Sequence, residues 1–212
     1  MITTRGKHVL TVYANIPADV EEDFNNWYNR QHIPERLAVP GFQSAVRYAS
    51  LKGEPKYIAL YELEDASVLD TPDYRQLGEK AKTDAWDQRI MPQLQVQART
   101  IYEQIFACGD VPAEHAPFLL SVRLDIAPEV EAEFNSWYNE DHLPKLAAVP
   151  GVACARRFRR LSGNGTQYLA LYELHNDQVT NTDAWSKAAN TAWTQKIRPH
   201  LKPVTNLARR IC

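Results

Sequence analysis

Apolar and polar residues alternate with a period of two over residues 9–16 and again over residues 118–126. This period is typical of β-strands with one buried face. Further along the first part of the chain, the patterns predict strands at 42–48, 57–63 and 95–105 and helical segments within 73–91. A Pro-Gly turn at residues 40–41 precedes the second strand, and Gly53 marks the loop before the third.

Between the first two strands, residues 17–32 change to a helical period, with acidic residues in the first turn where the helix dipole favours them. We expect this helix to end near His32, because Pro34 pushes Ile33 out of the α region.

The chain repeats itself. Residues 20–48 align without a gap to residues 130–158, and 15 of the 29 positions are identical. The match resumes at 57–63 with 168–174 and at 85–94 with 192–201. Such self-similarity predicts a duplicated structural unit. We assign one copy to residues 1–108 and the other to residues 109–212, each a βαββαβ unit of ferredoxin-like order.

A unit of this kind covers one sheet face with helices and leaves the other face bare. Two fused copies can bury both bare faces against each other, so we predict an α+β fold in which the repeats form one intramolecular barrel with a lined interior. Two independent domains on a linker are the alternative, but the junction after Cys108 lacks a Gly/Ser-rich spacer.

Composition narrows the possible partners. The net charge of −2 gives no general attraction for nucleic acid, and we read the run from Arg156 to Arg160 as a strand with outward arginines. Three dispersed cysteines and an N-terminal segment without an apolar core indicate reduced thiols, no export and a cytoplasmic protein. No stretch is apolar and long enough to span a membrane.

On the first predicted helix, five side chains fall on the face that packs on the sheet: Phe24, Trp27, Tyr28, Gln31 and His32. In the second copy these are Phe134, Trp137, Tyr138, Asp141 and His142. The two histidines end this buried face and are candidates for acid–base catalysis, with Asp141 beside His142. The alternative is that each imidazole only caps the core by bonding a loop carbonyl. For the flanking asparagines, Asn25, Asn29, Asn135 and Asn139, we expect local capping or loop bonds.

The pattern F-N-x-W-Y-N-x-x-H-[IL]-P, followed by V-P-G and a strand, resembles the EthD-like branch of the dimeric α+β barrel superfamily. The resemblance covers both halves. It implies the barrel fold and points to His32 and His142 as acid–base residues. The superfamily includes cofactor-free dehydratases, decarboxylases, cyclases, isomerases and monooxygenases, along with some haem-dependent enzymes, so the reaction stays open.

Strand alternation predicts which side chains line the barrel interior. In the first strand these are Tyr13 and Asn15, and in its repeat Arg123 and Asp125. In the third strand of each copy, tyrosines flank a small alanine and would leave room for a ligand; they are Tyr57, Tyr61, Tyr168 and Tyr172. The alternative is that these tyrosines face the helices and fill core. We expect the second half to hold the reactive groups, because it adds Arg123, Asp125 and Asp141 to its histidine.

Motifs for phosphate loops, nucleophile elbows and zinc sites are absent from the sequence. Together with the resemblance, which implies acid–base chemistry at the helix histidine, this leads us to expect a small-molecule enzyme without cofactor or metal, a lyase or isomerase working by histidine acid–base catalysis on an aromatic or carbonyl-containing metabolite. The alternatives are a non-catalytic ligand-binding or scaffold protein, and a cofactor-free or haem-dependent monooxygenase, for which His200 is the candidate axial ligand. We expect no nucleic-acid or membrane partner and a monomeric pseudo-dimer, with a further homodimer left open.

Overall fold

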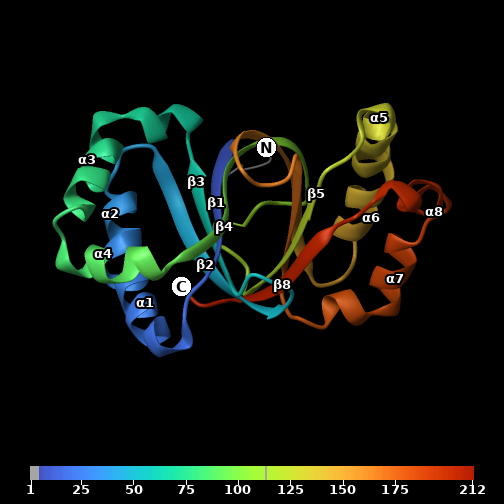
Figure 1. The fold of residues 1–212 in the computed structure, drawn as a ribbon. Helices are drawn as coiled ribbons and strands as arrows, with labels where there is room; N and C mark the ends of the chain where they lie inside the picture. The colour runs from blue at the N-terminus through green and yellow to red at the C-terminus, as the bar shows by residue number, and fades with distance from the viewer. Residues whose placement is uncertain (1–4, 113) are drawn as a thin grey trace.

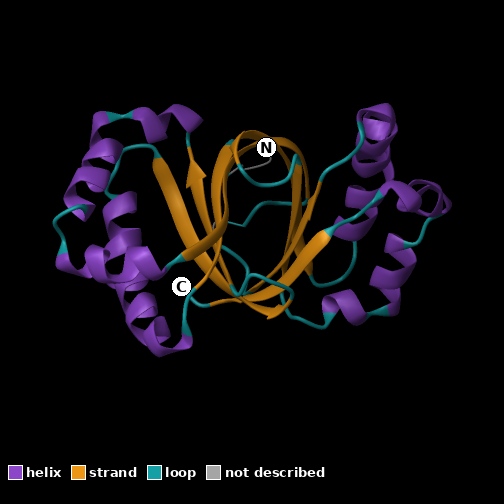
Figure 2. Cartoon of the chain, in the orientation of Figure 1, coloured by secondary structure: helices purple, strands orange, loops and turns teal. Residues whose placement is uncertain are grey.

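A closed β-barrel with helices on two opposite sides forms the centre of the molecule (Figures 1 and 2). The computed structural model describes residues 5–112 and 114–212, so residues 1–4 of the N-terminal segment lie outside the described residues. Helices α1 to α4 lie on one side of the barrel and α5 to α8 on the other. The predicted α+β class and the closed barrel are confirmed.

The eight strands are β1 (His8–Asn15), β2 (Phe42–Lys52), β3 (Tyr57–Leu63), β4 (Gln95–Cys108), β5 (Phe118–Leu124), β6 (Val152–Gly163), β7 (Tyr168–Leu174) and β8 (Val204–Arg210). The helices are α1 (Glu21–Trp27), α2 (Ile33–Leu37), α3 (Pro72–Ala81), α4 (Ala85–Ile90), α5 (Pro128–Trp137), α6 (Leu143–Ala147), α7 (Asp183–Ala189) and α8 (Ala192–Ile197). Two π-helical turns, Tyr28–His32 and Tyr138–His142, join α1 to α2 and α5 to α6.

Both halves of the chain arrange their strands in the same way. Around the barrel the order is β1-β3-β2-β8-β5-β7-β6-β4, closed by pairing of β4 with β1. Antiparallel pairs β2–β8 and β4–β6 join the first half to the second. Because hydrogen bonds run continuously around the ring, the halves share one sheet. The alternative of two independent domains is therefore wrong.

Strand β3 shows how the sequence divides between the two sides of the sheet. Ile58 and Leu60 point into the barrel, while Tyr57 and Tyr61 pack with the helices of the first half. In β7, Tyr168 and Tyr172 likewise face the helices. The expectation that these four tyrosines line the barrel interior is therefore wrong. Both faces of β3 and β7 are buried, so side-chain alternation did not reveal which face was which.

Side chains from all eight strands fill the barrel interior. They are Val9, Tyr13, Val46, Tyr48, Ile58, Leu60, Ala98, Tyr102, Leu119, Phe158, Leu169, Leu171 and Ala208, and none is more than 7% exposed. Tyr13 and Arg123 do point inward as predicted, but they bond to neighbouring side chains. The hydroxyl of Tyr13 lies 2.6 Å from that of Ser121, and the Arg123 guanidinium stacks 3.9 Å from the Tyr13 ring centroid. The barrel interior is therefore a packed core, and the prediction of a ligand pocket inside it is wrong.

A buried charge cluster lies within the same interior. The Arg156 guanidinium donates to both carboxylate oxygens of Glu62, at 3.1 and 2.5 Å, and lies 3.6 Å from Glu173. Burial disfavours the charge of Glu173, but His115, Arg5 and Arg156 outweigh it and lower the pKa of that carboxyl to about 2. The expectation of outward arginines in the run 156–160 holds for Arg159 and Arg160, which are exposed, but not for Arg156 and Arg157. Paired charges of both signs make this burial tolerable.

The V-P-G turn that both halves share has a steric origin. Gly41 and Gly151 adopt positive φ angles of 95° and 97°. A Cβ at these positions would lie 2.4 Å from Val68 and 2.6 Å from Val179. Each glycine thus permits both the turn and the close approach of the following segment.

The predicted helical region 73–91 consists of two helices, α3 and α4, and the last strand of the first half extends to Cys108. Among the described residues, no helix is both long and apolar enough to cross a membrane.

Candidate functional site

Each half of the molecule has a cavity between the outer face of its sheet and its helices. The first pocket, in the first half, has a volume of about 350 Å³. It is lined by Leu10, Val12, Tyr28, His32, Arg36, Tyr61, Leu69, Tyr74, Arg75, Leu77, Gly78, Met91, Leu94, Val96 and Arg99. The second pocket, of about 370 Å³, is lined by Val122, Leu124, Trp137, Tyr138, His142, Ala189, Thr194, Arg198, Leu201 and Pro203. Both volumes suit a small organic ligand.

A π-helical turn brings each histidine to its pocket. In the first half the amide of Ile33 donates to the carbonyl of Tyr28, five residues back, instead of the usual four. The helix then continues through Pro34 to Leu37, so the prediction that it ends near His32 is wrong. Ile33 keeps helical angles, φ −68° and ψ −51°, next to the wider turn. Such turns are frequent at functional sites.

Aromatic rings surround the imidazole of His32. Its ring centroid lies 4.3 Å from that of Trp27 and 4.6 Å from that of Tyr28. Its Nδ1 is fully buried and has no hydrogen-bond partner among the described residues. Burial, and then the charges of Arg36 and Arg47, hold the pKa of His32 well below its usual range. The ring is therefore neutral and does not bond a loop carbonyl.

His142 is placed in nearly the same way. Its ring stacks on Trp137 with a centroid distance of 4.3 Å, and its Nδ1 is likewise buried without a partner among the described residues. Burial lowers the pKa of His142 to about 4, although Asp141 opposes this shift. Both histidines thus present neutral imidazoles to their pockets.

Two phenols lie beside His32. The hydroxyl of Tyr61 donates to that of Tyr28 at 3.0 Å, and both side chains line the first pocket. Burial raises the pKa of Tyr61 well above its usual value, so the phenol keeps its proton. In the second half the hydroxyls of Tyr172 and Tyr138 are 3.5 Å apart, and Tyr172 does not line the second pocket. The first pocket therefore has the closer pair of proton donors.

Asp141 does not hydrogen-bond His142. Its carboxylate accepts from Thr191 at 2.6 Å and pairs with Lys145. Burial raises the pKa of this carboxyl, but the bonds from Lys145 and Thr191 outweigh it and lower the pKa below its usual value. The predicted neighbourhood of His142 with Asp141 and Arg123 is therefore not assembled.

The remaining predicted binding residues lie outside both pockets. Asn15 accepts from the amide of Lys56, and exposed Asp125 accepts from that of Gln167, which places both at strand ends. Tyr57 and Tyr168 donate to Glu21 and Glu131 near the starts of α1 and α5. Of the predicted site residues, His32 and Tyr61 line the first pocket together, and His142 is the one that lines the second pocket.

Sequence reasoning missed a buried arginine in each half. The Arg47 guanidinium donates to Asn29 at 3.1 Å and to Asn25 at 2.8 Å, and it lies 4.1 Å from the Tyr28 ring centroid. Arg157 repeats these contacts with Asn139, Asn135 and Tyr138. The four asparagines thus hold arginines rather than cap the helix as expected. The signal was present, because Arg47 and Arg157 occupy identical positions in the repeat.

The haem alternative depends on His200, and the structure does not provide a fitting site around it. His200 is exposed at the end of the short 3₁₀ turn Arg198–His200 and lines neither pocket.

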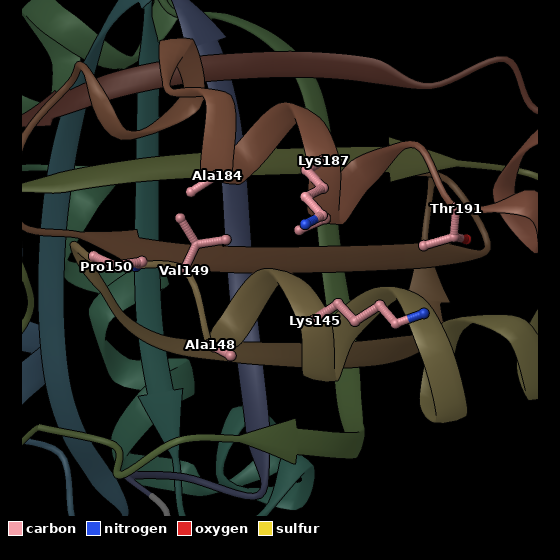
Figure 3. A pocket seen from close by; sticks show the side chains of 8 residues that line it. Lys145, Ala148, Val149, Pro150, Ala184, Lys187 and Thr191 are labelled. Atoms are coloured by element: carbon pink, nitrogen blue, oxygen red, sulfur yellow. The ribbon is translucent and has the colours of Figure 1, made fainter.

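A third cavity, of about 480 Å³, lies at the surface between α6 and α7 (Figure 3). It is lined by Lys145, Ala148, Val149, Pro150, Ala184, Lys187, Ala188 and Thr191. It contains no predicted site residue, and Lys145 already pairs with Asp141. The two pockets with half-buried histidines are therefore the better candidates.

The comparisons with known proteins bear on the fold. The model of a family described as "Domain of unknown function (DUF4286)" matches residues 7–109. No curated protein matches the chain. Among solved structures, an anthrone oxidase-like protein is 13% identical with a TM-score of 0.68, over 97% of this chain and 91% of its own. A candidate monooxygenase of Fusobacterium nucleatum is 8% identical, with a TM-score of 0.65 over 99% and 94%. A chlorite dismutase from Candidatus Nitrospira defluvii is 8% identical, with a TM-score of 0.60 over 95% and 90%.

The closed eight-stranded barrel of this chain is thus similar in fold to these solved structures. At such low identity they show the fold and leave the chemistry to the site itself.

Proposed function

We propose that the protein is an enzyme that moves a proton on a small aromatic or carbonyl-containing compound bound in the first pocket, with His32 as the acid–base residue. One observation carries this proposal. The neutral imidazole of His32 lines a cavity, and its buried Nδ1 has no partner within the described chain. A buried polar atom without a partner costs about 1–3 kcal/mol. His142 shares this feature, so the choice between the two halves rests on Tyr61, which lines the first pocket beside His32.

The chemistry follows from the protonation states. The neutral imidazole accepts a proton from a carbon next to the substrate carbonyl, so that a C–H bond breaks and an N–H bond forms. The electron pair moves to the carbonyl oxygen, where the Tyr28 hydroxyl, which accepts a hydrogen bond from Tyr61, can donate its own to the enolate. If the imidazolium returns the proton to another carbon of the conjugated enolate, the product is an isomer. If it gives the proton to a β-hydroxyl, the C–O bond breaks, water leaves, the enolate electron pair forms the new C=C bond, and the imidazole is neutral again. The low basicity of the imidazole is offset because the new cation forms beside an anion.

The first half is our choice because His32 and Tyr61 line one pocket there. The argument from sequence for the second half required Arg123, Asp125 and Asp141 around His142, and these side chains bond elsewhere. In this proposal, the second pocket is a related cavity without the phenol pair.

Proton exchange in D₂O tests the proposal without knowledge of the product. A panel of aryl ketones and aryl β-diketones is incubated with the protein, and loss of the α-proton signal is followed by NMR. We expect exchange with the wild type and a loss of about 100-fold in His32→Gln. The matched control is His142→Gln, which removes the equivalent imidazole and should keep exchange within about threefold.

Each other outcome counts against a defined part of the proposal. Exchange that persists in His32→Gln excludes His32 as the proton acceptor. Binding of panel members without exchange favours the non-catalytic ligand-binding protein. Absence of both binding and exchange contradicts the assignment of an aromatic carbonyl compound.

We further propose that the chain is a tandem duplication of an EthD-like, ferredoxin-like unit, divided as 1–108 and 109–212, that acts in the cytoplasm as a monomeric pseudo-dimer. The identical positions of the repeat and the common strand order of the halves support the duplication. Analytical ultracentrifugation tests the monomer, and a stable homodimer would contradict it.

A further inference from the structure

Three arginines line the first pocket. Arg36 comes from α2, Arg75 from α3 and Arg99 from β4. The repeat and the strand pairing place Leu146, Ser186 and Thr205 at the equivalent positions of the second half. The second pocket has Arg198, where the first has Met91. The concentration of positive charge is thus specific to the first pocket and is not a requirement of the fold.

Two of these three charges, Arg36 and Arg99, have no ion-pair partner among the described residues, and Arg75 has a distant one. Arg36 donates to the carbonyl of His32 at 3.0 Å, and Arg99 donates to the hydroxyl of Tyr74 at 3.0 Å. Within the part of the chain that the structure describes, neither guanidinium has a carboxylate within 4.0 Å, and Arg75 has Asp70 only at 3.9 Å. Each therefore keeps free N–H donors near the pocket.

The rest of the lining is apolar or aromatic. Tyr61 and Tyr74 provide ring surfaces and Leu77 and Leu94 provide aliphatic ones. A volume of about 350 Å³ holds a molecule of one or two fused rings. Cations beside such a lining suit a ligand with a flat apolar body and one anionic end.

We propose that the first pocket selects aryl carboxylates, with the carboxylate held by Arg36 and Arg99 and the ring packed on the tyrosines. The selection rests on the proposed function, because it names the substrate class of the same site. Guanidinium groups bind carboxylates through paired N–H donors, and this geometry favours a planar anion over a neutral amide of equal size.

A matched pair of probes tests the selection. 2-Naphthoate and 2-naphthamide have the same ring body and differ in charge, and their binding is measured by calorimetry. Met91 lines the first pocket and the chain has only two methionines, so its ¹³C-labelled methyl signal reports binding at this site. We expect 2-naphthoate to bind at least tenfold more tightly than 2-naphthamide, to shift the Met91 signal, and to weaken as salt rises.

Variants that copy the second half identify the contacts. Arg99→Thr and Arg36→Leu should each weaken 2-naphthoate at least tenfold and leave 2-naphthamide within about threefold. Arg209→Gln removes an exposed charge on β8 outside the pocket and should change neither affinity by more than about twofold. If the arginine variants unfold, Arg99→Lys, which keeps a charge without the paired donors, should still weaken 2-naphthoate.

Equal binding of the two probes, or unchanged affinity for 2-naphthoate in both arginine variants, overturns the selection. These results are separate from the proton-exchange test. Arginine-dependent binding without exchange on any ketone leaves the selection standing and removes the catalytic proposal. Proton exchange that depends on His32, combined with equal binding of the two probes, leaves the catalytic proposal standing and removes the selection.

Discussion

In the first half of the molecule, the indole of Trp27 donates to buried Asp87 on α4, which also accepts from Gln31 at 3.0 Å. In the second half, Trp137 donates instead to Thr194, which occupies the position of Asp87 in the repeat. The carboxylate of the second half lies on the π turn, at Asp141, where the first half has Gln31. Each half thus has one buried carboxylate at this contact. In the first half it lies on α4, and in the second half it lies on the π turn.

The comparison divides the residues of each half into a shared frame, which is the same in both halves, and surrounding groups, which differ. The arginine, its two asparagines and the aromatic rings are kept in both halves, and so are the π turn and its histidine. The groups around this frame differ, as the relocated carboxylate and the one-sided arginines of the first pocket show. Shared residues therefore report mainly on the fold, and differences between the halves report on what each pocket can bind.

The strongest test of the shared frame is removal of its arginines. Arg47→Met and Arg157→Met each leave two amide oxygens without a donor and remove a cation from three aromatic rings. We expect each to lower the free energy of unfolding by about 3 kcal/mol, measured by urea denaturation. Exposed Arg159→Met is the control and should lose less than about 0.5 kcal/mol. A loss of stability in only one of the two variants would show that the two arginines are not equivalent.

The histidines sharpen the comparison through pH. The unfolded imidazole takes up a proton near pH 6.5, and the folded His142 does so at about pH 4. The unfolded state therefore binds more protons between these values, and stability falls as pH decreases from 6.5 towards 4. We expect His142 to contribute on the order of 2 kcal/mol to this loss, and His142→Gln to lessen the dependence. Imidazole NMR checks the assignment, and titration of His142 near pH 6.5 would contradict it.

The smallest expected effect concerns the relocated carboxylate. Burial raises the pKa of Asp87, so its charge opposes folding at neutral pH, whereas the pKa of Asp141 is lowered and its charge favours folding. Asp141→Asn should thus cost about 1 kcal/mol at pH 7, because the pairing with Lys145 is lost. Asp87→Asn should cost less than about 0.5 kcal/mol. Denaturation at pH 7 measures the loss of unfolding free energy in both variants. A larger loss in Asp87→Asn than in Asp141→Asn would contradict this account of the two carboxylates.

The sequence predicted the architecture well, because the repeat relates residues about 110 apart and the first strand of each copy has a clear period of two. It failed where local pattern carries no information. The segment 57–63 is apolar on both faces, so Tyr61 could be assigned to either side of the sheet. The π turn spans five residues, which are too few to alter the hydrophobic period of the segment. Pro34 suggested a helix end, but the helix continues through it after the wider turn.

The contacts of the candidate site were harder to predict than its residues. The sequence named His32 and Tyr61 as candidates, but it placed Tyr61 in the barrel interior, and their common pocket depends on which sheet face carries the helices. Asp141 was placed beside His142 because they are neighbours in sequence, yet adjacent helical residues point in different directions. Arg36 and Arg99 are distant in sequence, and only the fold brings them to one cavity.

The ring of strands has a consequence for the chain once it is cut. The halves are linked covalently only between Cys108 and Phe118, while the β2–β8 and β4–β6 ladders connect them on both sides. Cleavage in that connection leaves two fragments whose exposed strand edges and apolar inner faces each require a partner. Co-expressed, they would reassemble into the nicked protein, and a fragment produced alone would pair with its own kind or precipitate.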